Sequence, residues 1–271
     1  MLFQRLLVVI VLVPLVALLA AVGGIVFQFF IALVLSIAVW EFWRIFYRGG
    51  YAPSKLLMIG GVLLLTLAPD REVFGFDGSA FVFSLLLLVT MTVHLVAYER
   101  GGEGAFTDFC ITIAGAAYLG WLGKYLIYLR ALPDGLWWLL LVIPAVWLTD
   151  VGGYLLGGAF GRHKMAVRLS PKKSWEGYAG GIVFAVLGSM LLAALWNLRS
   201  PMITVGKGAV IGLVISILSP LGDLGISMLK RQFGLKDTSR LLPGHGGMLD
   251  RIDSMLWSGV LGYYLIVILW L

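Results

Sequence analysis

The chain has 271 residues, of which 61% are hydrophobic and only 13% charged, a balance far from that of ordinary globular domains. Its formal net charge is +6, but the basic residues stand in short separate groups and form no basic tract interleaved with aromatic residues. Composition therefore leaves no room for a sizeable soluble domain and argues against a nucleic-acid partner. It predicts an integral membrane protein.

Apolar stretches long enough to cross a hydrocarbon core of about 30 Å as helices recur along the chain. We predict an all-α polytopic bundle of about nine transmembrane helices. Their expected spans are residues 6–22, 24–41, 56–69, 79–97, 107–130, 136–158, 177–196, 208–229 and 254–271. The first follows Arg5 and ends in small residues, as a signal peptide does. Its apolar core exceeds the roughly 7–15 residues of a signal h-region, so we expect it to be retained.

The distribution of basic residues predicts how the chain lies in the membrane. Nine crossings place the N-terminus and the loops near 42–55, 98–106, 159–176 and 230–253 on one side. That side holds all of the 20 Lys and Arg residues except Arg71, Lys124, Arg130, Arg199 and Lys207. The positive-inside rule therefore makes it cytoplasmic and puts the C-terminus outside. We expect the protein in a bacterial cytoplasmic (inner) membrane.

We treat residues 1–271 as a single transmembrane domain. Residues 1–135 are expected to serve packing, and residues 136–271 carry the loops with candidate motifs. Some of the 35 glycines form pairs four residues apart, a spacing that lets membrane helices approach closely. These pairs include Gly153 with Gly157, Gly177 with Gly181, and Gly208 with Gly212.

Two carboxylates lie in apolar runs, where an ionisable group is costly and is a functional hypothesis by default. They are Asp150 and Asp223. Pro220 precedes Asp223 closely and should break or kink its helix, which frees backbone carbonyls. Asp223, Ser227 and Lys230 have the i, i+4, i+7 spacing of one helical face. An internal Asp–Lys ion pair that only holds helices together is the alternative.

The loop after this helix is the densest in charge and glycine. Gly246 and Gly247 allow close backbone approach, so that their N–H groups can converge on phosphate oxygens. Mg²⁺ usually binds through one or two carboxylates together with substrate phosphates, which predicts Asp223 and Asp250 as ligands, with Asp253 on the same helical face as Asp250. Alternatively, Asp250 and Asp253 cap the last helix. His245 is either a general base, a turn residue or a phosphate donor.

The loop near 159–176 carries a second group of charges. Lys172 and Lys173 are available for anions. Ser170-Pro171 turns the chain, Ser174 is placed to cap the next helix, and Glu176 lies in its first turn, where the helix dipole favours a carboxylate. The alternative is a positive-inside anchor without a ligand, which explains the lysines but not Glu176.

These residues resemble the signature of the phosphatidate cytidylyltransferases, also called CDP-diacylglycerol synthases. The matching positions of the glycine-rich charged loop and its flanks are Ser227, Lys230, Arg231, Lys236, Asp237, Ser239, Leu242, Pro243, His245, Gly246, Gly247, Asp250, Arg251 and Asp253. An upstream block matches at Asp150, Tyr154, Gly161 and Ser170 to Gly177. Val151 and Ser174 depart from the family pattern without removing a charge. The resemblance covers the C-terminal half, and the N-terminal half agrees only in hydropathy.

The resemblance implies that CTP and phosphatidate give CDP-diacylglycerol and pyrophosphate with Mg²⁺ as cofactor, and it leaves a second, monovalent cation such as K⁺ open. The implied partners are CTP, phosphatidate and membrane lipid, and a homodimer is considered. The predicted catalytic set is Asp223, Asp250, Lys230, Arg231, Lys172, Lys173 and His245. Substrate binding is predicted for Lys236, Asp237, Gly246, Gly247, Arg251, Asp150, Glu176 and Ser227. The predicted metal ligands are Asp223, Asp250 and Asp253.

Three other classes of protein compete with this interpretation. An ion-coupled transporter also uses a proline-broken helix with a carboxylate, but no matching pair of broken segments repeats between the two halves of the chain. A structural scaffold needs no His-Gly-Gly between paired charges. A CDP-alcohol phosphotransferase would carry a run of Asp-Gly and spaced aspartates, which we do not find.

Overall fold

The computed structural model describes residues 14–68, 77–241 and 246–271, and helix dominates this part of the chain. Within it, seven helical segments are long and apolar enough to cross a membrane, which confirms the prediction of an all-α polytopic bundle. They are Gly24–Arg48, Gly78–Glu99, Ala105–Ala131, Gly135–Phe160, Trp175–Asn197, Val205–Gln232 and Leu249–Trp270. Lys55–Leu67 is a shorter apolar helix. Residues 14–22 are helical, and the rest of the expected first span lies outside the described residues.

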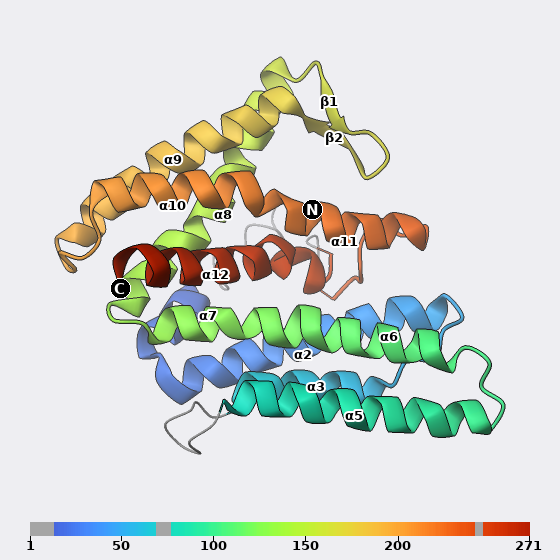
Figure 1. The fold of residues 1–271 in the computed structure, drawn as a ribbon. Helices are drawn as coiled ribbons and strands as arrows, with labels where there is room; N and C mark the ends of the chain where they lie inside the picture. The colour runs from blue at the N-terminus through green and yellow to red at the C-terminus, as the bar shows by residue number, and fades with distance from the viewer. Residues whose placement is uncertain (1–13, 69–76, 242–245) are drawn as a thin grey trace. The chain divides into compact units, whose positions relative to one another are not determined.

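The chain folds into two compact units, each drawn in Figure 1. Unit 1 comprises Met1–Ile127 and Asp237–Arg251. Unit 2 comprises Tyr128–Lys236 and Ile252–Leu271. The glycine-rich part of the loop before the last helix therefore folds with the N-terminal helices.

The described core of unit 1 is built from helices that pack side by side. Helix α3 (Lys55–Leu67) contacts α2 (Gly24–Arg48), α5 (Gly78–Glu99) and the π-helical turn η1 (Ala116–Trp121), which joins α6 (Ala105–Gly115) to α7 (Leu122–Ala131). Leu65, Leu86 and Ala116 meet at the centre of this packing. Lys124 of α7 is buried and donates to the Ala68 carbonyl and the Ser79 hydroxyl, which offsets the cost of an ammonium inside the bundle.

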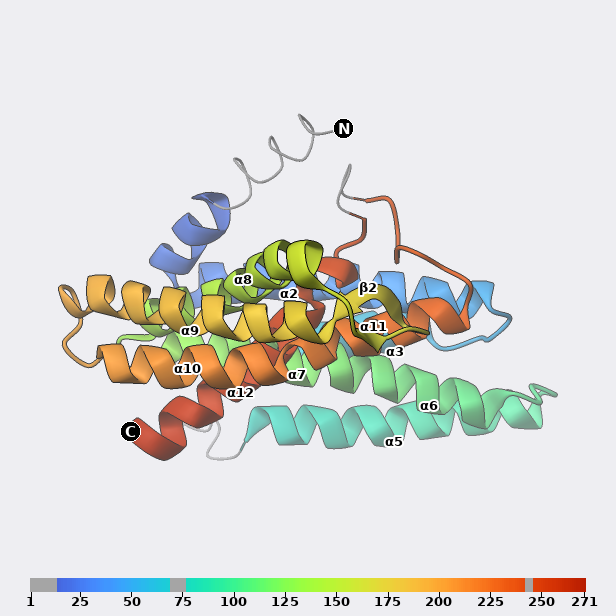
Figure 2. The same cartoon turned by 90° about the horizontal axis from the view of Figure 1, so that it is seen from above.

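Unit 2 is built on three long helices that approach closely. Helix α9 (Trp175–Asn197) packs between α8 (Gly135–Phe160) and α10 (Val205–Leu218), and Figure 2 shows α9 and α10 running side by side. The predicted glycine pairs lie at these contacts, and their role in close packing is confirmed. Gly177 faces Gly153 and Gly157, Gly181 faces the Thr149 carbonyl, Gly208 faces the Ser189 carbonyl, and Gly212 faces the Ala185 carbonyl.

A methyl group at Gly181 should destabilise unit 2. The added Cβ would lie 2.7 Å from the Thr149 carbonyl oxygen, and this atom belongs to a helix backbone that cannot yield cheaply. We expect Gly181→Ala to lower the free energy of unfolding by about 1–3 kcal/mol. Gly158→Ala is the matched control, because a Cβ there meets nothing within 4 Å. Thermal unfolding in detergent compares the two variants, and equal melting temperatures would contradict the packing role.

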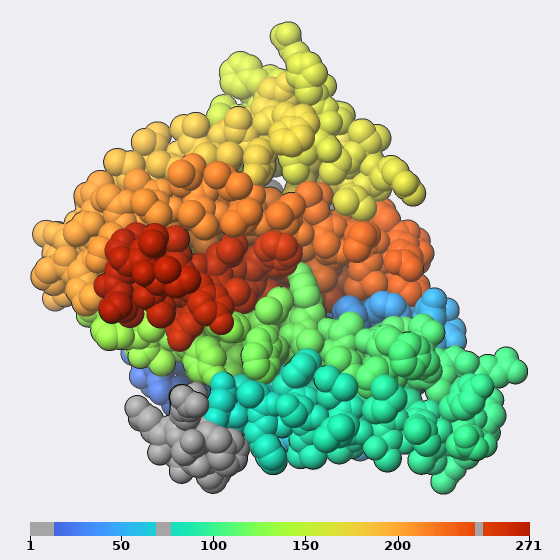
Figure 3. All heavy atoms as spheres, viewed as in Figure 1, coloured from blue at the N-terminus to red at the C-terminus, as the bar shows by residue number. Residues whose placement is uncertain are grey.

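Two features interrupt the helices at the charged loops of unit 2. Helix α11 (Pro220–Gln232) begins with Pro220 at its first position, directly after α10, as the predicted proline break requires. Strands β1 (Lys164–Ala166) and β2 (Ser170–Ser174) form an antiparallel hairpin where the sequence predicted only a turning loop. Figure 3 shows this hairpin projecting beyond the ends of α8 and α9. It carries Lys172 and Lys173 on β2.

Candidate active site

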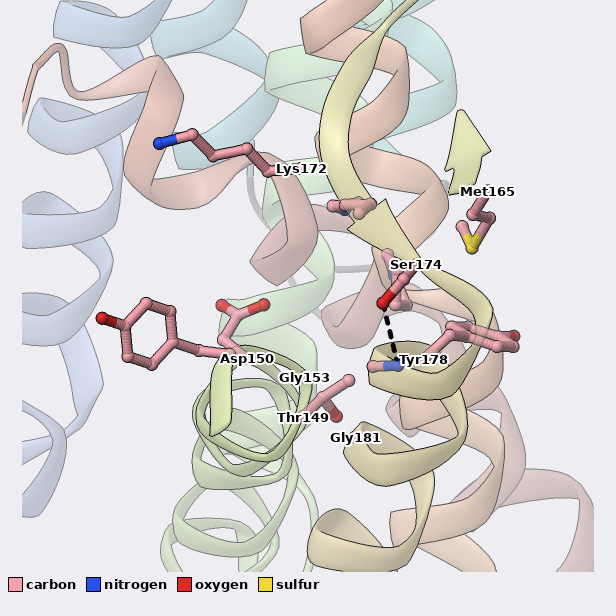
Figure 4. A pocket seen from close by; sticks show the side chains of 12 residues that line it. Thr149, Asp150, Gly153, Met165, Lys172, Ser174, Tyr178 and Gly181 are labelled. Atoms are coloured by element: carbon pink, nitrogen blue, oxygen red, sulfur yellow. Dashed lines mark hydrogen bonds between the residues drawn. The ribbon is translucent and has the colours of Figure 1, made fainter. Parts of the chain in front are cut away.

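A cavity of about 210 Å³ opens in unit 2 beside the hairpin (Figure 4). Its walls come from α8, the hairpin, α9 and the first residue of α11. The lining residues are Thr149, Asp150, Gly153, Tyr154, Met165, Lys172, Lys173, Ser174, Gly177, Tyr178, Gly181 and Pro220. In Figure 4 the Asp150 carboxylate points from α8 to the side of the cavity where β2 carries Lys172 and Ser174. The structure thus gathers three of the predicted site residues, Asp150, Lys172 and Lys173, around one cavity.

An ion pair joins the hairpin to α11 within unit 2. The Lys173 Nζ lies 2.5 Å from the Asp223 Oδ2, and each side chain is about one third exposed, at 29% and 33% respectively. Asp223 stands in the first turn of α11, where the helix dipole favours a negative charge. The Ser227 hydroxyl lies 3.5 Å from the Asp223 Oδ1, one turn along the same face, as the sequence spacing predicts. This pair brings the two motif blocks of the sequence together.

A second carboxylate, from α12 (Leu249–Trp270), belongs to the same charged group. Asp253 is buried and interacts electrostatically with Asp223, Lys230 and Asp150. Its Oδ1 also accepts a hydrogen bond of 2.6 Å from the Ser254 N–H. Unit 2 therefore concentrates three predicted acidic residues and several predicted lysines. Their individual roles stay predictions.

Glu176 holds the base of the hairpin. Its carboxylate accepts hydrogen bonds from the backbone N–H groups of Arg162 and His163, at 3.1 and 3.2 Å, and lies 2.5 Å from the His163 Nδ1. Ser174 caps α9 as predicted, accepting from the Gly177 N–H at 3.2 Å. These contacts tie the start of β1 to the start of α9, so Glu176 acts on the hairpin that carries Lys172 and Lys173.

Glu176→Gln should therefore weaken the hairpin. The amide group of glutamine would point a donor at one of the donors that the carboxylate now accepts from. We expect trypsin to cleave after Lys172 or Arg168 about tenfold faster in this variant. Glu103→Gln is the control, because Glu103 is exposed and lies in unit 1. Cleavage at the wild-type rate would show that Glu176 does not hold the hairpin.

Arg231 binds backbone rather than standing free for phosphate. Its Nε donates to the Leu169 carbonyl and its guanidinium also donates to the Leu235 carbonyl, both at 3.1 Å. The side chain fastens the hairpin tip to the end of α11. Because part of its donor capacity is used in this way, its predicted grip on phosphate stays a prediction.

Asp250 organises the glycine-rich loop inside unit 1. Its Oδ2 accepts from the Thr238 N–H at 2.9 Å and from the Gly247 N–H at 3.0 Å, and the Thr238 Oγ1 lies 2.9 Å away. Both N–H groups lie before the first residue of α12, so these bonds order the loop, and the capping role that is the alternative to metal binding stays a prediction. Asp223 belongs to the other unit, and the metal role predicted for Asp250 beside it stays a prediction.

Sequence reasoning missed Glu41, the buried acid of α2. Its side chain is fully buried and both carboxylate oxygens accept hydrogen bonds from the glycine-rich loop. The residue lies in the span 24–41, which is expected only to pack. The signal was present, because a lone glutamate in an apolar run is a functional hypothesis by the same rule that singled out Asp150 and Asp223.

The remaining predicted residues are placed as follows. Lys236, Asp237 and Arg251 are not buried, and Gly246 adopts a positive φ of 81°. His245 lies outside the described residues. In the described part of the chain no three His, Cys, Asp or Glu side chains are arranged to hold a metal ion by themselves.

The fold and this charged cavity define a polytopic membrane protein with a polar site in its second unit. The sequence model of the cytidylyltransferase family matches residues 3–269, nearly the whole chain. The chain belongs to the cytidylyltransferase family.

Relatives from two bacterial genera show the same affiliation. A phosphatidate cytidylyltransferase of Mycobacterium bovis is 32% identical over 253 residues, covering 88% of this chain and 79% of the relative. One from Mycobacterium tuberculosis is 32% identical over 88% of this chain and 74% of its own length. One from Brucella suis is 37% identical over 209 residues, covering 76% of this chain and 70% of the relative.

Proposed function

We propose that this protein transfers the cytidylyl group of CTP to phosphatidate, giving CDP-diacylglycerol and pyrophosphate. Relatives named phosphatidate cytidylyltransferase, at 32% and 37% identity, support the proposal. The single structural observation that carries it is the Lys173–Asp223 ion pair beside the cavity lined by Asp150 and Lys172. The ion pair places a lysine beside a carboxylate in a membrane protein. Two phosphorylated substrates require cations to neutralise their charge and carboxylates to position those cations.

The chemistry asks the protein for positioning and charge neutralisation. The nucleophile is a phosphate oxygen of the lipid, which is already ionised and needs no serine, cysteine or strong base. It attacks the α-phosphorus of CTP, a new P–O bond forms, and the bond to the bridging oxygen breaks as pyrophosphate leaves. Lys172 and Lys173, on strand β2 of the hairpin, reduce the repulsion between the two anionic substrates and the charge on the leaving group.

The carboxylates of unit 2 fit a divalent cation by their chemistry. Asp253 interacts through its charge with Asp223 and with Asp150, and each of the three carboxylates offers the hard oxygen ligands that Mg²⁺ prefers. Magnesium sites commonly use one or two carboxylates and complete the shell with water and substrate phosphates, so a closed protein cage is not required. We propose that Asp223 and Asp253 hold the ion and that Asp150 supports them. A bound Mg²⁺ ion would neutralise the negative charge of the substrate phosphates.

The proposal includes an orientation in the membrane. The loops with the hairpin and the glycine-rich segment face the cytoplasm, where CTP is available, and the C-terminus faces outward. The distribution of Lys and Arg supports this orientation. The bacterial origin of the relatives supports a bacterial cytoplasmic membrane.

Transfer of label into lipid tests the function. Purified protein in detergent receives phosphatidate, Mg²⁺ and CTP labelled in the base, and the organic phase is then extracted. We expect the label in the organic phase, and in the aqueous phase when phosphatidate is omitted. Folded protein that leaves all label in the aqueous phase would contradict the proposal. An ion-coupled transporter would also show this negative result.

A further inference from the structure

Glu41 joins two segments of unit 1 that lie about 200 residues apart in sequence. It stands in the last third of α2 (Gly24–Arg48), about 10 Å from the helix end by the rise of an α-helix. Its Oε1 accepts from the Ser239 hydroxyl at 2.5 Å and the Met248 N–H at 3.0 Å. Its Oε2 accepts from the Leu249 N–H at 2.8 Å and lies 3.0 Å from the Thr238 Oγ1.

Two of these donors belong to the start of α12. The first N–H groups of a helix have no partner inside the helix, and here the carboxylate of another helix accepts from Met248 and Leu249. A negative charge at this end is also favoured by the helix dipole. Glu41 thus fixes where α12 begins, one residue before Asp250.

The other two donors fix the opposite side of the loop. The Thr238 hydroxyl lies within hydrogen-bonding distance of both Glu41 and Asp250, but it has one hydrogen and donates to one of them at a time. Its backbone N–H donates to Asp250 regardless. Glu41, Thr238 and Asp250 therefore form one connected network that holds residues 238–239 beside residues 247–250, at the two ends of the loop that precedes α12.

The glycine at position 247 reflects the same contact. A Cβ there would lie 2.5 Å from the Glu41 Oε2 and would also overlap the Thr238 hydroxyl. The loop backbone can reach the carboxylate only because this position has no side chain. The absence of a side chain at Gly247 is therefore a second sign, beside the hydrogen bonds, that α2 and the glycine-rich loop are in close contact.

We propose that Glu41 is a positioning residue for the reaction: it holds the glycine-rich loop in the conformation in which Asp250 and Arg251 serve cytidylyl transfer. The inference rests on the proposed function. The Glu41 side chain is fully buried and faces the loop donors. It acts through Thr238, Ser239 and the start of α12, and the buried carboxylate is retained in an apolar span because four loop donors need an acceptor.

Glu41→Gln tests the proposal with a side chain of nearly the same size. The amide turns one acceptor oxygen into a donor that faces loop donors. We expect kcat to fall about 10–100-fold, as for residues that orient a site, while the KM for phosphatidate stays close to the wild type. The buried donors that lose their acceptor should also lower the melting temperature by a few degrees, with the protein still folded in detergent at the assay temperature. Glu103→Gln is the matched control, an exposed glutamate of the same unit. Wild-type kcat in Glu41→Gln would overturn the proposal.

A second pair of variants decides the matter if Glu41→Gln does not fold. Thr238→Val keeps the shape and removes the hydroxyl, whereas Thr238→Ser keeps the hydroxyl. We expect Thr238→Val to lower kcat about tenfold and Thr238→Ser to restore most of it. Where both proteins fold, the double variant of Glu41→Gln and Thr238→Val should be no slower than Glu41→Gln alone. Fully additive losses, or a wild-type rate in Thr238→Val, would contradict action through this bond.

Trypsin cleavage after Arg240 separates this inference from the proposed function. Arg240 is exposed in the loop that Glu41 holds, so we expect faster cleavage in Glu41→Gln than in the wild type. Wild-type protein without transferase activity would refute the function, whatever the cleavage rate. An active wild type with unchanged cleavage and unchanged kcat in Glu41→Gln would refute the positioning role alone.

Discussion

Replacing Asp223 with asparagine should slow cytidylyl transfer about 10²–10³-fold, the scale observed when a site loses one group that stabilises developing charge. Asparagine keeps the volume of the side chain but removes the charge that faces Lys173. It also removes one of the two carboxylates proposed to hold Mg²⁺. Initial rates at saturating CTP and phosphatidate measure the effect, with thermal unfolding as the test of folding.

Variants of two hairpin lysines test whether the ion pair itself is required. Lys173→Gln removes the other half of the ion pair and should also slow transfer, whereas Lys164→Gln changes an exposed lysine on the neighbouring strand and should leave the rate unchanged. Asp223→Asn with wild-type turnover would defeat the site assignment. Equal losses in Lys173→Gln and Lys164→Gln would show that the hairpin contributes only overall charge.

Removal of divalent cations should abolish transfer. Asp223 and Asp150 both repel Asp253, and the carboxylates repel the phosphates of both substrates, so productive binding needs positive charge beyond that of the lysines. We expect no labelled lipid after treatment with EDTA, and full recovery when Mg²⁺ is added in excess. Residual rates in the presence of the chelator would contradict the proposed metal requirement.

The Mg²⁺ dependence of single variants tests which residues bind the required ion. Asp253→Asn should raise the Mg²⁺ concentration needed for half-maximal rate, because it removes a proposed ligand, while Glu103→Gln should not. An unchanged Mg²⁺ dependence in Asp253→Asn would remove this residue from the metal site.

Local sequence features predicted the helices well. Long apolar runs, the proline at the start of α11 and the Ser174 cap of α9 depend on residues close together in the chain, and the structure bears them out. The hairpin was missed because its strands are short and rich in lysine and serine, a composition typical of a loop. Its stability comes from outside, through Glu176 at its base and Arg231 at its tip.

The contacts within the site depend on folding and were not predictable from spacing. Asp223 has Lys230 on its own helical face, yet the ammonium beside its Oδ2 belongs to Lys173, about 50 residues earlier in the chain. Glu41 could have been singled out as a lone carboxylate in an apolar span, but its partners could not. Its four donors come from residues 238–249, which fold with the N-terminal helices in unit 1.

Position-specific phosphorus labels test the central claim most directly. In one reaction CTP carries the label at the α-phosphorus, and in a parallel reaction at the γ-phosphorus, each with purified protein, phosphatidate and Mg²⁺. We predict that the α-label enters the lipid and that the γ-label stays in water as pyrophosphate. Label from the γ-position in lipid would mean phosphoryl transfer, and lipid free of both labels would mean no transfer. Either result would contradict attack of the lipid phosphate on the α-phosphorus.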